Sequence, residues 1–189
     1  MAAPKDRAAA VRGALRTLVA DHGFHGASMS AVAKEAGVAT GTAYTHYASK
    51  DALVVAAYCE TKADLAVAIT AGLDLTAPPQ ERFHAVWLSC YHYLTANPVH
   101  ARFLLQVEHS PYRLAAHEAA LTNDNDPLLA QVARPDMAAW LVPLPLDVLY
   151  ELALSPAVRL AAGGVELAPD ELDLVAEGCW RAISKADST

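Results

Sequence analysis

Apolar residues recur at the spacing of an α-helix along almost the whole chain. Val11, Leu15 and Leu18 lie on one face of the first such segment, and Gly23 follows it. Because glycine readily closes a helix in the left-handed conformation, we expect the first helix to end there. No stretch of five or more residues alternates between apolar and polar as a half-buried strand does. The pattern therefore predicts an all-α protein.

Proline, glycine and capping residues divide the rest of the chain into further helices. In the N-terminal part we expect short helices over 29–36 and 41–47 and a long helix from residue 50 to about residue 71. Further along, the expected helices cover the ranges 80–96, 99–109, 111–121, 127 to about 132, 146–162 and 170–184. We expect Pro156 to bend or interrupt its helix, and the prolines around Trp140 to make that stretch irregular.

The two short helices near the N-terminus are joined by a tight turn at Gly37 and resemble a helix-turn-helix. In that motif the second helix enters the major groove of DNA. Here it carries Thr40, Thr42 and Thr45, whose small hydroxyl and methyl groups allow close approach to base edges. Gly41 lacks a side chain where the backbone would meet phosphate. The segment is therefore a candidate DNA-binding motif.

Polar groups surround the same short helix. Tyr44, His46 and Lys50 supply donors of the kind that contact DNA phosphates. The alternative is an ordinary helical hairpin in which Tyr44 and Tyr47 are core residues. The motif alone leaves both interpretations open.

Charge is unevenly distributed along the chain. Residues 1–50 hold six basic and three acidic residues, a balance of +3, whereas the remainder has a balance of −10. A basic segment on an acidic body suggests a small head that binds a polyanion, with a body that DNA would repel. A chance fluctuation is the alternative, because a charge of +3 is small.

The segment Ser28 to Leu53, SMSAVAKEAGVATGTAYTHYASKDAL, closely resembles the DNA-binding region of TetR-type transcriptional regulators. The positions that match the family pattern are Val32, Ala33, Ala36, Gly37, Val38, Gly41, Thr42, Tyr44, His46, Tyr47, Ser49, Lys50 and Leu53. Two departures are mild: Ala43 stands where a larger apolar residue is usual, and Tyr47 replaces the commoner Phe. Neither departure removes an expected DNA contact.

The resemblance implies a role for each polar position of the head. Ser28 would contact a phosphate, and Tyr44, His46 and Lys50 would clamp the DNA backbone. The positions that would approach base edges or adjacent phosphates are Ser30, Thr40, Gly41, Thr42 and Thr45.

The resemblance also implies a dimer. The segments 146–162 and 170–184 resemble the last two helices of the family, which pair with their copies in a four-helix interface. The expected interface residues are Leu149, Leu152, Ala153, Pro156, Leu160, Leu172, Val175, Cys179 and Trp180. The alternative is that both helices bury this face within their own domain.

A pocket for a small-molecule effector is implied by the family rather than by spacing. The residues expected to line it are Trp87, Cys90, Tyr91, Phe103, Leu104, Val107 and Tyr112. For each of them an ordinary place in the core is the alternative. The sequence does not identify the effector, and we expect no cofactor.

Other classes of protein receive little support. The histidines of the body lack the i, i+4 spacing of a helical metal pair, so a metal sensor would need tertiary convergence. The chain has no Gly-rich phosphate loop, nucleophile elbow or HExxH motif, and we expect no enzymatic activity. Three widely spaced cysteines, no signal peptide and no apolar run of about 18 residues predict a cytoplasmic protein without a membrane partner.

We therefore expect an all-α chain with a three-helix DNA-binding head over residues 1–50 and a helical-bundle domain for ligand binding and dimerisation over residues 51–189. Its expected function is that of a repressor that binds a pseudo-palindromic operator as a homodimer and is released by a small molecule. The alternative is a helical small-molecule-binding protein or metal sensor without sequence-specific DNA binding.

Overall fold

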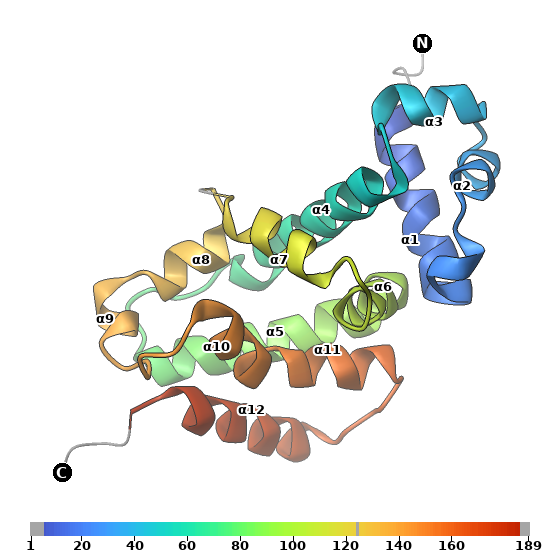
Figure 1. The fold of residues 1–189 in the computed structure, drawn as a ribbon. Helices are drawn as coiled ribbons and strands as arrows, with labels where there is room; N and C mark the ends of the chain where they lie inside the picture. Colours follow the sequence, from blue (N-terminus) through green and yellow to red (C-terminus); the bar gives the residue numbers. More distant parts are fainter. Residues whose placement is uncertain (1–5, 124, 186–189) are drawn as a thin grey trace. The chain divides into compact units, whose positions relative to one another are not determined.

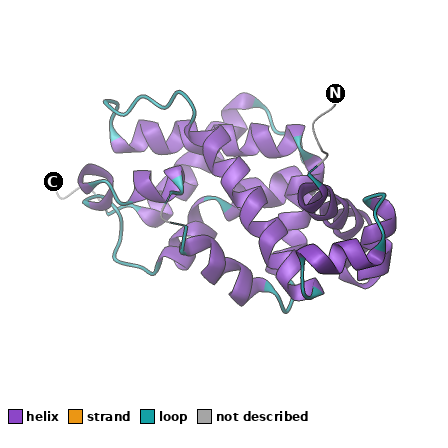
Figure 2. Ribbon diagram, turned by 90° about the horizontal axis from the view of Figure 1, so that it is seen from above, coloured by secondary structure: helices purple, strands orange, loops and turns teal. Residues whose placement is uncertain are grey.

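The computed structural model describes residues 6–123 and 125–185. Within these residues the chain is helical, apart from loops and one isolated antiparallel bridge between Leu141 and Ser184 (Figures 1 and 2). The predicted all-α class is confirmed. None of the helices in the described ranges is long and apolar enough to cross a membrane.

The chain divides into two compact units, and each is described by itself. The first unit combines the segment through Lys62 with Arg102–Thr122, and the second combines Ala63–Ala101 with the chain from Asn123 onward. The expected functional boundary at residue 50 stays a prediction. The helices in chain order are α1 (Arg7–Gly26), α2 (Met29–Glu35), α3 (Thr40–His46), α4 (Lys50–Thr70), α5 (Pro79–Ala96), α6 (Pro98–Glu108), α7 (Arg113–Leu121), α8 (Pro127–Val132), α9 (Pro135–Ala138), α10 (Leu146–Ala153), α11 (Ser155–Ala162) and α12 (Pro169–Ile183).

In the first unit α1, α2 and α3 pack on one another around a small apolar core. Val11, Leu15 and Val19 of α1, Val32 of α2 and Ala43 of α3 are completely buried. Burying a Val or Leu side chain contributes about 1.5–3 kcal/mol, so these contacts hold the three short helices together.

The first helix does not stop at Gly23 as expected. Gly23 adopts a φ of +68°, which kinks the chain, but a further helical turn continues to Gly26. The N–H of Ala27 then donates to the carbonyl of Phe24 at 3.4 Å. The glycine therefore breaks the direction of α1, and the expected linker is partly helical.

The turn between α2 and α3 is closed by Gly37, which has a φ of +68°. The N–H of Gly37 donates to the carbonyl of Lys34 at 3.1 Å, and the N–H of Val38 donates to the carbonyl of Ala33 at 2.9 Å. This pair of hydrogen bonds is a Schellman motif, which satisfies the last carbonyls of a helix and turns the chain sharply. The predicted helix-turn-helix connection is confirmed.

In the second unit α11 and α12 pack against α5, and α10 contacts both α11 and α12 (Figure 1). Trp87 is completely buried on α5, and its indole N–H donates to the carbonyl of Ala153 at 3.0 Å. The hydroxyl of Tyr91 donates to the carbonyl of Val165 at 2.9 Å. Each large aromatic side chain thus buries its ring and satisfies its polar group.

The segment 146–162, expected to be bent or interrupted at Pro156, is interrupted and forms two helices. Helix α10 ends at Ala153, and α11 begins at Ser155. Pro156 lies in the first turn of α11. Proline has no N–H, and its ring clashes with the carbonyl four residues earlier, so the helix breaks just before it at Leu154.

Candidate DNA-binding surface

Helix α3 turns almost all of its polar side chains outward. Ala43 is its buried residue, whereas the ring of Tyr44 is 51% exposed. Tyr47, which follows α3, is buried. The hairpin alternative is therefore wrong for Tyr44 and right for Tyr47. Thr42 is half-buried, and the other candidate contact residues of α3 that are exposed are Thr40, Gly41, Thr45 and His46.

Two serines stand at the start of α2. The hydroxyl of Ser28 accepts a hydrogen bond from the N–H of Ala31 at 3.2 Å and so caps the helix. It also lies 3.0 Å from the hydroxyl of Ser30. Both residues are exposed, so they are accessible to a ligand beside the free N–H groups of the helix. Their contact with phosphate stays a prediction.

Nothing in the described structure requires glycine at position 41. Its φ is not positive, and a methyl group added there would meet no atom within 4 Å. Gly41 is the second residue of α3, and glycine favours a helix less than alanine does. A residue that weakens the helix without serving its packing is typical of a point where another molecule approaches the backbone. The neighbouring Thr45 hydroxyl donates to the carbonyl of Gly41 at 2.9 Å.

Lys50 is held against the end of α1. Its ammonium donates to the carbonyl of Phe24 at 2.5 Å and lies 5.8 Å from the centre of the Phe24 ring. Burial lowers the pKa of Lys50, and the nearby carboxylate of Asp51 opposes this shift. The ammonium retains further donor hydrogens, so it can bind the carbonyl and a phosphate together.

A carboxylate outside the motif organises the same unit. Glu60 on α4 accepts a hydrogen bond from Arg12 of α1 at 2.5 Å and another from Arg16. Arg12 also donates to the hydroxyl of Tyr47 at 2.5 Å. Burial opposes ionisation of Glu60, but the two arginines hold the pKa of its carboxyl below the usual value. Sequence spacing gave no sign of this network, because Glu60 lies far from its partners along the chain.

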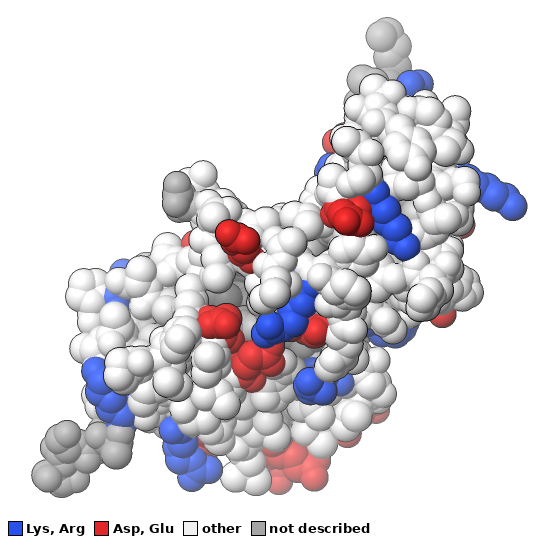
Figure 3. All heavy atoms as spheres, viewed as in Figure 1, with Lys and Arg blue, Asp and Glu red and all other residues white. Residues whose placement is uncertain are grey.

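The network around Glu60 lowers the number of cations in residues 1–50 that are available to attract DNA. Arg12 and Arg16 are two of the six cations in residues 1–50, and both are committed to Glu60. On the face shown in Figure 3 the cations stand singly or beside carboxylates rather than in one continuous patch. Attraction to DNA would therefore depend on a few exposed cations, among them Arg7 and Lys34.

The residues expected to line an effector pocket fall in both units. Trp87, Cys90 and Tyr91 belong to the second unit, and Phe103, Leu104, Val107 and Tyr112 belong to the first. Tyr112 is half-buried and tilts against Phe24 at 4.8 Å between ring centres, and the others are at most 5% exposed. These burials fit the core alternative, and the pocket stays a prediction.

The nine residues expected at the dimer interface differ in how far they are buried. Four are packed inside the second unit: Ala153, Leu172, Cys179 and Trp180. For them the structure matches the alternative, burial within the chain's own domain. Leu152 is 39% exposed, and the half-buried ones are Leu149, Pro156, Leu160 and Val175. The expected set missed Val148, which is 37% exposed on α10, and Leu174, which is 64% exposed on α12.

Four histidines of the body contact carboxylates or aromatic rings, and these are His84, His92, His100 and His117. His84 lies 3.0 Å from Asp173. His117 lies 2.5 Å from Glu108 and stacks on Tyr58 at 5.5 Å between ring centres. Among the described residues no three potential metal ligands converge.

Replacing Glu60 with Gln should destabilise the protein by roughly 1–2 kcal/mol at pH 7, because two partly buried arginines lose their counter-ion. The pKa of the Glu60 carboxyl is depressed in the folded state, so its stabilisation is present above the unfolded value of about 4.3 and disappears as the pH falls. Urea unfolding between about pH 7 and pH 3 should show the deficit of Glu60→Gln shrinking in acid. Glu118→Gln, an exposed carboxylate of the same unit, is the control. An equal deficit at every pH would contradict the ion-pair account.

Comparison with known proteins matches both parts of the chain. Residues 12–57 match the family described as bacterial regulatory proteins of the tetR family. Residues 78–184 match the tetracyclin repressor-like C-terminal domain.

Full-length relatives agree with these matches. An HTH-type transcriptional regulator of Haemophilus influenzae is 30% identical over 187 residues, which cover 97% of this chain and 98% of the relative. The crystal structure of a TetR-family regulator from Haemophilus influenzae is 29% identical, with a TM-score of 0.75, and the match covers 95% of this chain and 97% of that one. A TetR-family protein from Vibrio parahaemolyticus is 28% identical, with a TM-score of 0.71, and covers 96% of this chain and 100% of its own. These relatives are transcriptional regulators and not enzymes, and the chain belongs to the TetR family of helix-turn-helix transcriptional regulators.

Proposed function

We propose that the protein is a cytoplasmic repressor that binds a pseudo-palindromic operator as a homodimer and leaves it when a small molecule binds the domain expected over residues 51–189. The observation that carries this proposal is the surface of α3. This helix buries Ala43 and exposes hydroxyl, phenol and imidazole groups around a glycine that the fold does not require. A helix built in this way fits the major groove, where small polar groups reach base edges.

The proposed DNA contacts are of two kinds. Some position the protein on the duplex, and others distinguish one base sequence from another. Thr40, Thr42 and Thr45 would meet base edges, where a threonine methyl can contact the methyl of thymine. Ser28 at the start of α2 and Lys50 at the start of α4 would bind phosphates. Phosphate contacts fix the register of the protein on the duplex and carry no sequence information themselves.

Dimerisation would use the exposed apolar residues of α10 and α12. Val148, Leu152 and Leu174 present side chains to solvent, and water-exposed leucine and valine at this density suit an interface. Gly178 of α12 has open space where a side chain would lie, which would allow a second helix to approach closely. Two copies would place two α3 helices in successive major grooves about 34 Å apart.

Effector release follows from coupling between two sites. Regulators of this family bind DNA and act as dimers with small-molecule effectors. If an effector binds a conformation whose head spacing no longer fits the operator, it lowers the affinity for DNA. By thermodynamic linkage DNA lowers the affinity for the effector by the same factor.

The substitution Gly41→Ala should change stability and DNA affinity in opposite directions. Alanine should raise the free energy of unfolding by about 0.5–1 kcal/mol, because it is the better helix former. The same methyl group should weaken binding to operator DNA by about tenfold, because it meets the DNA backbone. Thermal unfolding and fluorescence anisotropy on one preparation measure both effects.

Gly37→Ala is the matched control. Position 37 has a φ of +68°, so alanine there should destabilise the fold by about 1 kcal/mol. A Gly41→Ala variant that binds DNA as well as the parent would remove α3 from the proposed interface.

Leu174→Asp tests the dimer. A carboxylate at this exposed position is harmless in a monomer but would be desolvated in the proposed interface, so light scattering should give a monomer mass. Leu114→Asp is the control, because Leu114 is 76% exposed on α7 in the first unit and lies outside the proposed interface. A dimer that persists in Leu174→Asp, or a monomer produced by Leu114→Asp, would place the interface elsewhere.

A further inference from the structure

The second unit carries a hollow of about 490 Å³ near the end of α12. Its lining residues are Pro78, Pro79, Gln80, Trp140, Trp180, Arg181, Ser184 and Lys185. The volume is within the range of small-molecule sites, about 300–1,000 Å³. None of the seven residues expected to line an effector pocket belongs to it. The hollow is thus a separate feature of the second unit.

Backbone hydrogen bonds join two segments that line the hollow. The N–H of Lys185 donates to the carbonyl of Trp140 at 2.8 Å, and the N–H of Val142 donates to the carbonyl of Ile183 at 2.9 Å. These bonds fasten the loop that carries Trp140 to the end of α12. Trp180 packs on Phe83 with 5.4 Å between ring centres. The backbone around the hollow and the ring of Trp180 are therefore held by contacts within the chain.

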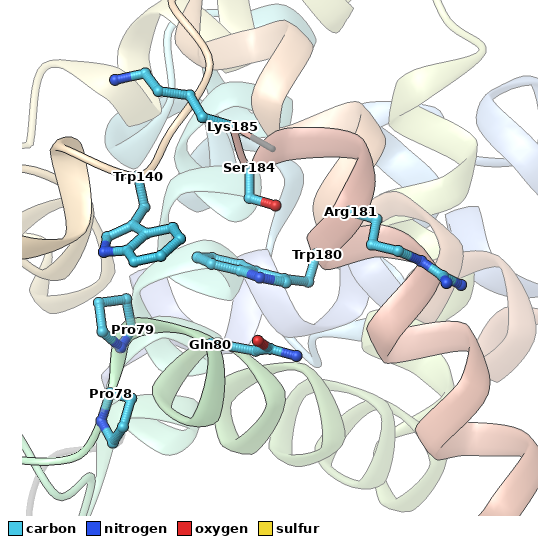
Figure 4. Close-up of a pocket in the computed structure, with 8 residues that line it drawn as sticks. All are labelled: Pro78, Pro79, Gln80, Trp140, Trp180, Arg181, Ser184 and Lys185. Carbon is cyan, nitrogen blue, oxygen red and sulfur yellow. The ribbon is translucent and has the colours of Figure 1, made fainter. Parts of the chain in front are cut away.

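The two tryptophans differ in exposure. Trp180 is 6% exposed, whereas Trp140 is 41% exposed. Figure 4 shows the two rings beside each other, with Pro79 next to Trp140. An indole left 41% exposed keeps apolar area available for contact, and indoles stack well on flat rings.

Among the described residues that line the hollow, the charged side chains have one sign. Arg181 and Lys185 are the charged residues among the eight that line it, and Figure 4 shows their side chains extending in opposite directions, away from the two indole rings. The side chain of Arg181 is 68% exposed and contacts Glu177 only at 3.6 Å, a pair that stabilises little. The ammonium of Lys185 donates to the carbonyl of Ala139 at 2.7 Å, which leaves its charge uncompensated by that partner.

This combination selects one ligand chemistry. Tryptophan faces attract either organic cations or aromatic rings. Arg181 and Lys185 on the rim repel an organic cation. They attract an aromatic ring that carries an anionic group. From these contacts we propose that the hollow binds a small planar aromatic carboxylate, with its ring against Trp140 and Trp180 and its carboxylate toward Arg181. Arg181 lies on the same face of α12 as Leu174 and Gly178, so the proposal rests on a dimer interface that leaves Arg181 accessible.

The test uses the indole N–H resonances of the full-length protein during titration with 2-naphthoate. The chain has three tryptophans, so the spectrum has three such signals. Those of Trp140 and Trp180 should shift and saturate. The signal of Trp87, which is completely buried and bonded to the carbonyl of Ala153, should stay in place.

One neutral analogue and three variants distinguish the contribution of the charges to the affinity from that of the ring contacts. 2-Naphthamide should bind about tenfold more weakly than 2-naphthoate. Arg181→Gln should lower the affinity for the carboxylate to that of the amide, and Trp140→Ala should remove saturable binding. Arg159→Gln, an exposed cation on α11, should leave the affinity unchanged.

Three results would overturn the proposal. One is the absence of a saturable shift at Trp140 and Trp180. The second is an equal shift of the Trp87 signal, which would place the naphthoate in the interior. The third is equal affinity for the acid and the amide in the parent protein, because the cations would then play no part.

Discussion

The orientation of α3 depends on a carboxylate that lies outside the helix-turn-helix. Glu60 of α4 binds Arg12 and Arg16 of α1, and Arg12 donates to the hydroxyl of Tyr47, the residue that follows α3. Because these groups are partly buried, their hydrogen bonds are stronger than those of a fully solvated ion pair, and leaving one partner alone is costly. The network ties the end of α3 to two longer helices, so the exposed face of α3 belongs to a rigid body. A binding surface is most selective when such supporting contacts fix its position.

The same constraint explains which residues α3 can expose. Ala43 is small enough to bring α3 close to the unit's core, and the Schellman turn at Gly37 sets the direction in which the helix leaves α2. Because contacts on its buried side fix the position of α3, the residues on its outward face do not need to pack against the rest of the unit. It therefore carries Gly41 and Thr45, residues that favour a helix less than alanine does but suit contact with another molecule.

The sequence predicted most of the fold because proline and glycine mark where helices begin and end. It predicted a bend or an interruption at Pro156 without deciding between them, since propensity does not say whether a proline bends a helix or ends it. It also placed the end of α1 at Gly23, although one more turn follows. Such details depend on which tertiary contacts are available to the next turn.

The sequence predicted which residues of the candidate site face outward better than it predicted the contacts that support them. The outward position of most polar residues of α3 follows from helical periodicity alone. The partners of Arg12 and of Lys50 do not, because they come from segments distant in the sequence. The expected interface illustrates the same limit. Periodicity identifies an apolar face, but it does not distinguish Trp180, which packs inside the chain, from Leu174, which faces solvent.

The central claim is that α3 of a dimer reads DNA sequence, and selection from a pool of random duplexes tests it most directly. The purified protein should enrich an inverted repeat. It should bind that repeat on the order of 10³-fold more tightly than scrambled DNA, with an affinity that falls steeply as salt is added. Failure to enrich any sequence, with no binding to duplex DNA even at low salt, would contradict the account.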